Sequence, residues 1–153
     1  MKHLSSILLV LTAVTVLAVE QSSSITIRGW QFDFPAFLKQ EATAGPDFTV
    51  TYFTSTERKI TVGIYEGMHP QQFADKHPNV THEQALIDGQ TTSWSMWETG
   101  DTNKEYHAEL YLDIVPGAKP VEKFHIFANT ITREDLILIQ QAVNHARKTK
   151  SKN

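Results

Sequence analysis

Apolar and polar residues alternate along most of the chain beyond residue 24, which is the pattern of strands with one buried face. The alternation predicts six strands, at residues 25–34, 48–54, 60–64, 90–98, 104–115 and 121–131. A short link at residues 55–58 predicts a hairpin between the second and third of these strands. Turn-forming residues at 100–103 and 116–120 separate the last three strands, which we therefore expect to form an antiparallel meander.

The last apolar segment has a period near 3.6 and predicts an amphipathic helix. Thr132 is suited to cap its first turn, and Asp135 occupies the capping-box position. One stripe of this helix carries Leu136, Ile139, Val143 and Ala146. Shorter helical segments are expected at residues 35–43, 70–76 and 81–87, where prolines and a second capping-box pattern occur.

These elements predict an α+β fold of the α/β-sandwich type. It consists of an antiparallel sheet of about six strands, the long C-terminal helix on one face, and a shorter helical layer. No repeat, low-complexity segment or internal linker divides the chain after its N-terminal residues. We therefore expect a single α+β domain at residues 25–148.

The first residues have the composition of a secretory signal peptide. Lys2 supplies a positive charge, and residues 4–19 form an almost unbroken apolar run. This run is shorter than the roughly 20 residues of a membrane-spanning helix and fits the apolar region of a leader. We predict a signal peptide at residues 1–18, a polar linker at 19–24 and a basic tail at 149–153. An uncleaved leader that anchors the protein in the membrane is the alternative.

The composition indicates where the protein is located and argues against a nucleic-acid partner. The chain has 153 residues, a formal net charge of −3 and no cysteine. Basic residues cluster only in the C-terminal tail, so we expect no nucleic-acid partner. An exported domain without disulfides depends on its hydrophobic core for stability, and this favours a periplasmic or secreted protein of bacterial type.

Two short segments and the order of the elements resemble the PsbP/DcrB-like proteins, a group of exported α/β-sandwich domains. Residues 27–35, Ile-Arg-Gly-Trp-Gln-Phe-Asp-Phe-Pro, are similar to the first strand of that group. Residues 87–90, Ile-Asp-Gly-Gln, are similar to the entry into its central meander, and the helix after Ile131 matches its closing helix. The resemblance implies a binding or accessory role and assigns no functional residue.

One face of the strand at residues 104–115 carries several groups that can bind ligands. These groups are Glu105, His107, Glu109, Tyr111 and Asp113. Neighbours on one strand face are about 6.5–7 Å apart, and carboxylates at this spacing repel one another unless a cation or a basic partner lies there. The strand therefore predicts a cation site or an acidic patch, with an ordinary solvent-facing strand as the alternative.

His125, on the next predicted strand, faces the same side as His107. We expect these two histidines to lie near each other, with Glu105 and Glu109, in a cluster that could bind a metal or small ligand or exchange protons. The spacing of three other histidines does not fit a metal site, and these are expected to be exposed loop residues: His69, His77 and His82. No nucleophile motif accompanies the cluster, so no catalytic residue and no metal ligand is assigned.

Trp94 and Trp97 lie on opposite faces of the fourth predicted strand. Both cannot belong to the same core, so one of them is expected to face a groove or a partner. Trp97 with Tyr65 or Tyr111 is the predicted binding patch, because exposed Trp and Tyr are typical of protein interfaces. In the alternative interpretation, residues 70–87 cover this face and bury Trp97.

Together these features predict a non-catalytic binding or accessory protein of the periplasm that binds another envelope or secreted protein. One alternative is an immunity or inhibitor protein against a periplasmic toxin or cell-wall hydrolase. Another is a carrier of a metal or small ligand. No cofactor is expected, and contact with a membrane is expected only through an uncleaved leader.

Overall fold

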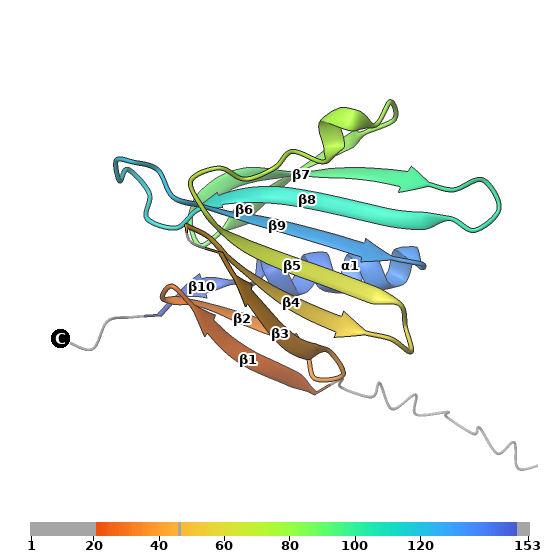
Figure 1. The fold of residues 1–153 in the computed structure, drawn as a ribbon, viewed down its shortest axis with the longest axis horizontal. Coiled ribbons are helices and arrows are strands. Elements are labelled where there is room, and N and C mark those ends of the chain that lie inside the picture. Colours follow the sequence, from red (N-terminus) through yellow and green to blue (C-terminus); the bar gives the residue numbers. More distant parts are fainter. Residues whose placement is uncertain (1–20, 46, 150–153) are drawn as a thin grey trace, which may run out of the picture.

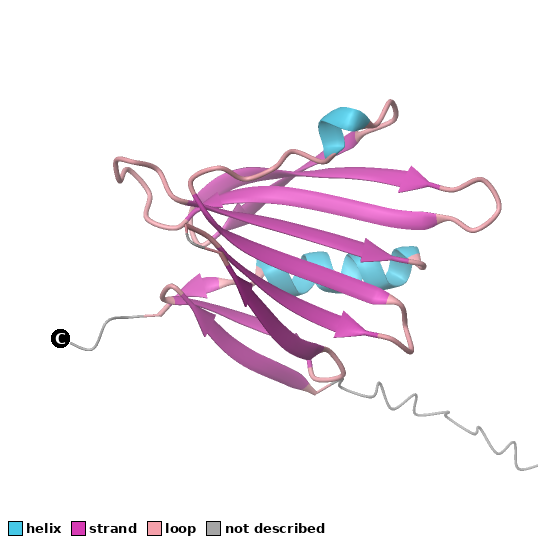
Figure 2. Cartoon of the chain, in the orientation of Figure 1, coloured by secondary structure: helices cyan, strands magenta, loops and turns pink. Residues whose placement is uncertain are grey.

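The computed structural model describes residues 21–45 and 47–149 and shows a protein made mainly of strands (Figure 2). The strands are β1 (Ser22–Ile27), β2 (Trp30–Pro35), β3 (Lys39–Ala44), β4 (Thr49–Ser55), β5 (Ile60–Gly67), β6 (Thr81–Ile87), β7 (Gln90–Thr99), β8 (Glu105–Asp113), β9 (Lys123–Thr130) and β10 (Arg147–Lys148). An α-helix, α1 (Arg133–Asn144), and a short 3-10 helix, η1 (Ala74–Lys76), complete the described elements. The predicted signal peptide and residues 150–153 of the predicted basic tail lie outside the described residues.

Seven strands form one antiparallel sheet in the order β3-β4-β5-β9-β8-β7-β6. A small second sheet consists of β1, β2 and β10, with β2 in the middle. Figure 1 shows the small sheet below the large one and α1 behind the large sheet. We call the face of the large sheet that α1 and β2 cover the inner face, and the opposite side the outer face.

The inner face holds the hydrophobic core, since α1 and β2 both contribute to it. Their fully or almost fully buried side chains are Trp30, Phe32 and Phe34 on β2 and Leu136, Ile139 and Val143 on α1. The ring of Phe32 packs edge-on against that of Phe124 on β9, with the centroids 5.8 Å apart. The indole Nε1 of Trp30 donates to the carbonyl of Ile114 over 3.0 Å. One continuous core therefore joins both sheets and the helix.

The predicted α/β sandwich is wrong. The described residues form ten strands in two sheets and one α-helix, and they contain no second helical layer. Helical segments were expected at residues 35–43 and 81–87, but residues 39–44 and 81–87 are the edge strands β3 and β6 of the large sheet. Both pair along their whole length with the neighbouring strand. Backbone pairing at a sheet edge therefore outweighs the local helical pattern in these two segments.

The first predicted strand is in fact a hairpin, because the chain reverses at Arg28 and Gly29 between β1 and β2. Both residues have positive φ, at 49° and 77°. Asp88 and Gly89, with φ of 46° and 81°, reverse the chain between β6 and β7 in the same way. Two consecutive left-handed residues make the tight turn that matches the twist of a hairpin.

The prediction is confirmed for the central strands and for the start of the helix. β7, β8 and β9 form the expected antiparallel meander, and β4 and β5 form the expected hairpin. Thr132 caps α1, and its hydroxyl oxygen accepts the backbone N–H of Asp135 over 3.1 Å. Within the described residues, no helix is both long and apolar enough to span a membrane.

Gly63 on β5 leaves room on the outer face for the ring of Phe127 on β9, its cross-strand partner. A Cβ at position 63 would lie 2.1 Å from a carbon of that ring. We expect Gly63→Ala to displace Phe127 and to lower the free energy of unfolding by about 1–3 kcal/mol, as measured by urea denaturation. In a Phe127→Ala background the added methyl has space, so an equal cost there would contradict this explanation.

Candidate functional site

The outer face of the seven-stranded sheet brings most of the predicted site residues together. On β8 it carries Glu105, His107, Glu109, Tyr111 and Asp113, as the alternation predicts. Tyr65 on β5 and Tyr111 on β8 are the cross-strand neighbours of His125 on β9. Trp97 on β7 is paired with His107. His107 and His125 therefore lie on the same face of the sheet, but they are not cross-strand partners of each other.

Residues 68–80, which we call the strap, connect β5 to β6 across this face. Figure 1 shows the strap in green, leaving the end of β5 and reaching β6 by way of η1. A helix was expected at residues 70–76, but the helical part is limited to the three residues of η1. Before η1, the strap binds the sheet through the carbonyl of Gln71 and the backbone N–H of Phe73.

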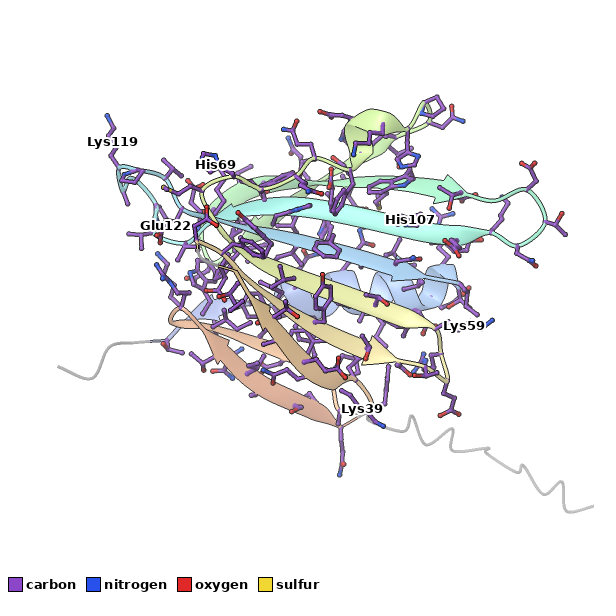
Figure 3. The ribbon with its side chains drawn as sticks, viewed as in Figure 1. Lys39, Lys59, His69, His107, Lys119 and Glu122 are labelled. Carbon is purple, nitrogen blue, oxygen red and sulfur yellow. The ribbon has the colours of Figure 1, made fainter. Side chains whose placement is uncertain are left out.

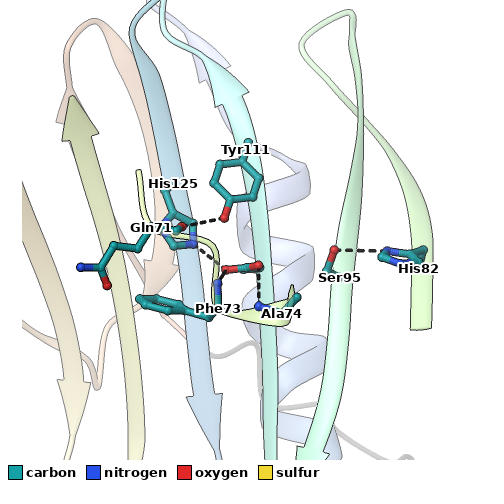
Figure 4. A network of polar contacts seen from close by, with 8 residues as sticks. Gln71, Phe73, Ala74, His82, Ser95, Tyr111 and His125 are labelled. Carbon is teal, nitrogen blue, oxygen red and sulfur yellow. Dashed lines mark hydrogen bonds and ion pairs between the residues drawn. The ribbon is translucent and has the colours of Figure 1, made fainter. Parts of the chain in front are cut away.

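Glu109 fastens the strap to the sheet, and Figure 4 labels its partners Phe73, Ala74 and His125. Its Oε1 accepts the backbone N–H of Ala74 over 2.9 Å, and its Oε2 accepts that of Phe73 over 3.0 Å. The Nε2 of His125 lies 2.8 Å from the same Oε2. Glu109 is 2% exposed and His125 is 1% exposed. Because both oxygens accept hydrogen bonds from the chain itself and the side chain is buried, Glu109 acts as an anchor of the strap.

The hydrogen bonds at this anchor favour the ionised carboxylate. Burial by itself raises the pKa of Glu109, but the hydrogen bonds from His125, Ala74 and Phe73 outweigh it, so that pKa lies below its ordinary value of 4.5. Burial and the negative charge of Glu109 raise the pKa of the neighbouring Tyr111. The protonated Tyr111 hydroxyl donates to the carbonyl of Gln71 over 2.7 Å. Two side chains of β8 thus hold the strap at neighbouring points.

A cleft of about 350 Å³ opens beside the strap, and we call it the tyrosine cleft. Its walls include Phe48, Tyr52, Tyr65, His69, Phe73 and Phe127. The rings of Phe48 and Tyr65 stack with centroids 5.8 Å apart. The ring of His125 also lines the cleft, stacked at 4.6 Å on that of Tyr111. The predicted patch residue Tyr65 is therefore placed in a cleft with several other aromatic side chains.

A second cleft, of about 380 Å³, contains Trp97, and we call it the indole cleft. Phe73 and Phe127 line both clefts. The ring of Trp97 stacks against those of His77 on the strap and His107, with centroid distances of 5.0 and 5.3 Å. Trp97 is 7% exposed, but it does not belong to the inner core. The strap buries Trp97, as the alternative interpretation expected of residues 70–87, but residues 81–87 of that segment form the edge strand β6 and do not cover the face.

The remaining predicted groups form separate pairs. The Nζ of Lys123 lies 2.7 Å from a carboxylate oxygen of Asp113. Glu105 lies 3.7 Å from the Nε2 of His107, which also contacts the Thr99 hydroxyl at 2.8 Å. Burial lowers the pKa of His107. In the described residues, no group of three or more His, Cys, Asp or Glu side chains is arranged to hold a metal ion.

One interpretation of the sequence placed residues 70–87 over this face, but it did not predict the contact between the strap and Glu109. Phe127 could have been found, because it alternates with Ile126 and so shares the outer face with His125. Phe73 and Ala74 bind Glu109 through backbone N–H groups, which every residue except proline carries. No side-chain pattern could therefore have indicated that contact.

No protein-family model matches the chain, and no curated protein matches it either. The resemblance to the PsbP/DcrB-like proteins and the periplasmic location therefore stay predictions.

Proposed function

We propose that this protein is a non-catalytic binding protein of the cell envelope and that it binds another exported protein through the outer face of its seven-stranded sheet. The inner face is filled by β2 and α1. The buried acid–base pair of the outer face, Glu109 with His125, is used to hold the strap. The tyrosine cleft, which is lined by aromatic side chains, is the surface that we assign to the partner.

The observation that carries this proposal is the group of exposed apolar side chains at one end of the tyrosine cleft. Phe48 lines the cleft and is 37% exposed, and Met68 follows the last residue of β5. Val115 and Val121 flank the backbone hydrogen bond of Ile114 to Glu122, which closes the loop between β8 and β9. Phe48, Ile114 and Glu122 line one further hollow, so these loops meet at the same end of the sheet.

Figure 3 labels His69 and Glu122 at this end of the molecule. Aromatic residues in a cleft, bordered by exposed apolar residues and a polar rim, are typical of surfaces that bind proteins. A partner residue inserted beside Tyr65 would be buried on several sides, which is the usual environment of a dominant interface contact. We therefore place the centre of the interface at Phe48 and Tyr65.

Site-specific photocrosslinking in living cells of the source organism tests this function. We expect a photoreactive phenylalanine analogue at position 48 or at position 65 to crosslink one and the same exported protein. The matched control is position 137, because Ile137 is 46% exposed but lies on α1, which covers the opposite face of the sheet. With the purified partner, Phe48→Ala and Tyr65→Ala should weaken binding at least tenfold, and Ile137→Ala should leave it unchanged.

Crosslinks that form equally from position 137, or a partner whose affinity is insensitive to Phe48→Ala and Tyr65→Ala, would contradict the proposed interface. The nature of the crosslinked protein also separates two versions of the function. A toxin or a cell-wall hydrolase would identify an inhibitor, whereas another structural protein of the envelope would identify an accessory role.

A further inference from the structure

Trp97, which lines the indole cleft, carries a hydrogen-bond donor without an acceptor. Trp97 Nε1 is buried and has no partner among the described residues. The other two indoles are satisfied, since Trp30 Nε1 donates to the Ile114 carbonyl over 3.0 Å and Trp94 Nε1 to Asn144 Oδ1 over 2.9 Å. Buried N–H groups are almost always paired in folded proteins. An unpaired one beside a cleft therefore marks a position where an acceptor from outside the chain would be stabilised.

The other polar groups of the indole cleft favour a negatively charged acceptor. Lys76, His77 and His107 line it, together with the uncharged Thr61 and Asn129, and no Asp or Glu does. Glu105 is the acid in contact with this cluster, 3.7 Å from the Nε2 of His107, and its own side chain is half exposed. The tyrosine cleft differs, because Asp47 is part of its wall.

We infer that the indole cleft binds a carboxylate group of the partner, with one oxygen accepting the Trp97 Nε1–H and Lys76 providing the opposite charge. This inference rests on the proposed function and adds the chemistry of one contact to it. An acidic side chain and a C-terminus both present a carboxylate. The two clefts share Phe73 and Phe127, so a single bound segment can place an apolar residue in one cleft and its carboxylate in the other.

Binding in this cleft requires a local movement of the strap. Trp97 Nε1 lies below the surface, and the ring of His77 on the strap packs on the indole at a centroid distance of 5.0 Å. Lys76 and His77 come after the two anchored residues Phe73 and Ala74, and among the described residues their backbone N–H groups donate to the carbonyls of Phe73 and Ala74. The anchor at Glu109 can therefore stay in place while the ring of His77 swings away from the indole.

The three indole N–H signals in a ¹H–¹⁵N correlation spectrum of the full chain provide a direct test. Trp97→Phe removes one signal and so assigns it. The probes are N-acetylglycine, which has a terminal carboxylate, and N-acetylglutamate α-methylamide, which has a side-chain carboxylate. We expect at least one of them, at millimolar concentration, to move the Trp97 signal downfield and to leave those of Trp30 and Trp94 in place. The probe that acts identifies the source of the carboxylate.

Matched probes and variants decide whether charge is recognised. N-acetylglutamine α-methylamide is the uncharged control and should leave the Trp97 signal unmoved. Lys76→Gln should weaken binding of the active probe about tenfold, whereas Lys39→Gln, a change at an exposed lysine of β3, should not alter it. A Trp97 signal that no carboxylate moves, or that the glutamine probe moves equally, would overturn the inference.

The photocrosslinking experiment and the indole N–H experiment can fail independently of each other. If a partner crosslinks through positions 48 and 65 but no carboxylate moves the Trp97 signal, the proposed function stands and the carboxylate contact is wrong. If the signal moves but no partner is found, the cleft is a carboxylate site and the protein-binding function is wrong.

Discussion

Glu109→Ala is expected to lower the free energy of unfolding by about 3–5 kcal/mol, because it removes a buried carboxylate and leaves its hydrogen-bond donors unpaired. The substitution leaves three groups without their hydrogen-bond partner, namely the buried imidazole of His125 and the N–H groups of Phe73 and Ala74. Urea denaturation at pH 7 measures the loss. Glu105→Ala on the same strand face is the matched control, and its exposed side chain should cost less than about 0.5 kcal/mol.

A milder variant separates the anchoring role from a general loss of stability. Glu109→Gln keeps one carbonyl oxygen and should cost less than Glu109→Ala. In both variants we expect amide hydrogen exchange at Phe73 and Ala74 to be faster than in the unaltered protein, since the strap is released locally. Amides in the strands of the sheet should be accelerated less. Exchange at these two amides that matches the unaltered protein would show that Glu109 does not hold the strap.

The anchor also predicts the direction of a pH effect. The pKa of Glu109 is lower in the folded protein than its ordinary value of 4.5, so the unfolded chain takes up the proton first as the pH falls. The stabilisation is therefore fully present above about pH 5 and is lost on further acidification. The difference in stability between the unaltered protein and Glu109→Gln should shrink over this range. A constant difference down to the acid transition would contradict the lowered pKa.

Phe32→Ala should lower the free energy of unfolding by about 3–5 kcal/mol, which is as much as Glu109→Ala. Phe32 on β2 is fully buried, with its ring edge-on to Phe124 at 5.8 Å and stacked on Phe34 at 6.0 Å. The substitution empties a space between the two sheets that neighbouring side chains fill only in part. Thermal and urea denaturation should show a single transition at a lower midpoint, because the small sheet shares one core with the large sheet.

Phe48→Ala is the matched control for this substitution, since it removes the same atoms from a residue that is 37% exposed. We expect Phe48→Ala to cost less than half as much as Phe32→Ala. A comparable loss for both would mean that the β1–β2 hairpin contributes no more to the core than a surface residue does. Two separate transitions in Phe32→Ala would mean that the small sheet unfolds as an independent unit.

The sequence alone was sufficient to predict the parts of the fold in which the pattern of apolar and polar side chains reflects burial. The meander of β7, β8 and β9 alternates apolar and polar residues because its inner face is covered by α1, and turn residues separate the strands. The start of α1 was also predictable, because the cap by Thr132 is a local interaction between residues three positions apart. The same alternation placed Glu109, His125 and Trp97 together on the outer face.

The edge strands were not predictable in this way. All six residues of β3 are exposed, so no alternation marks them, and they pair with β4 through backbone groups that any of these residues carries. β6 buries only Ala85 and Ile87, and its capping-box pattern suggested a helix. The Asp88–Gly89 dipeptide that follows is a strong hairpin signal, and it would have corrected this assignment.

Only the tertiary structure decided whether the outer face of β8 is solvated or covered. Glu109 and Glu105 look alike in the sequence pattern, yet one is buried against the strap and the other is exposed. The difference arises from backbone N–H groups of residues more than thirty positions away, which leave no trace in side-chain composition. The sequence thus determined which groups share a face, and the path of the strap determined which of them are buried, paired or left with an unused donor.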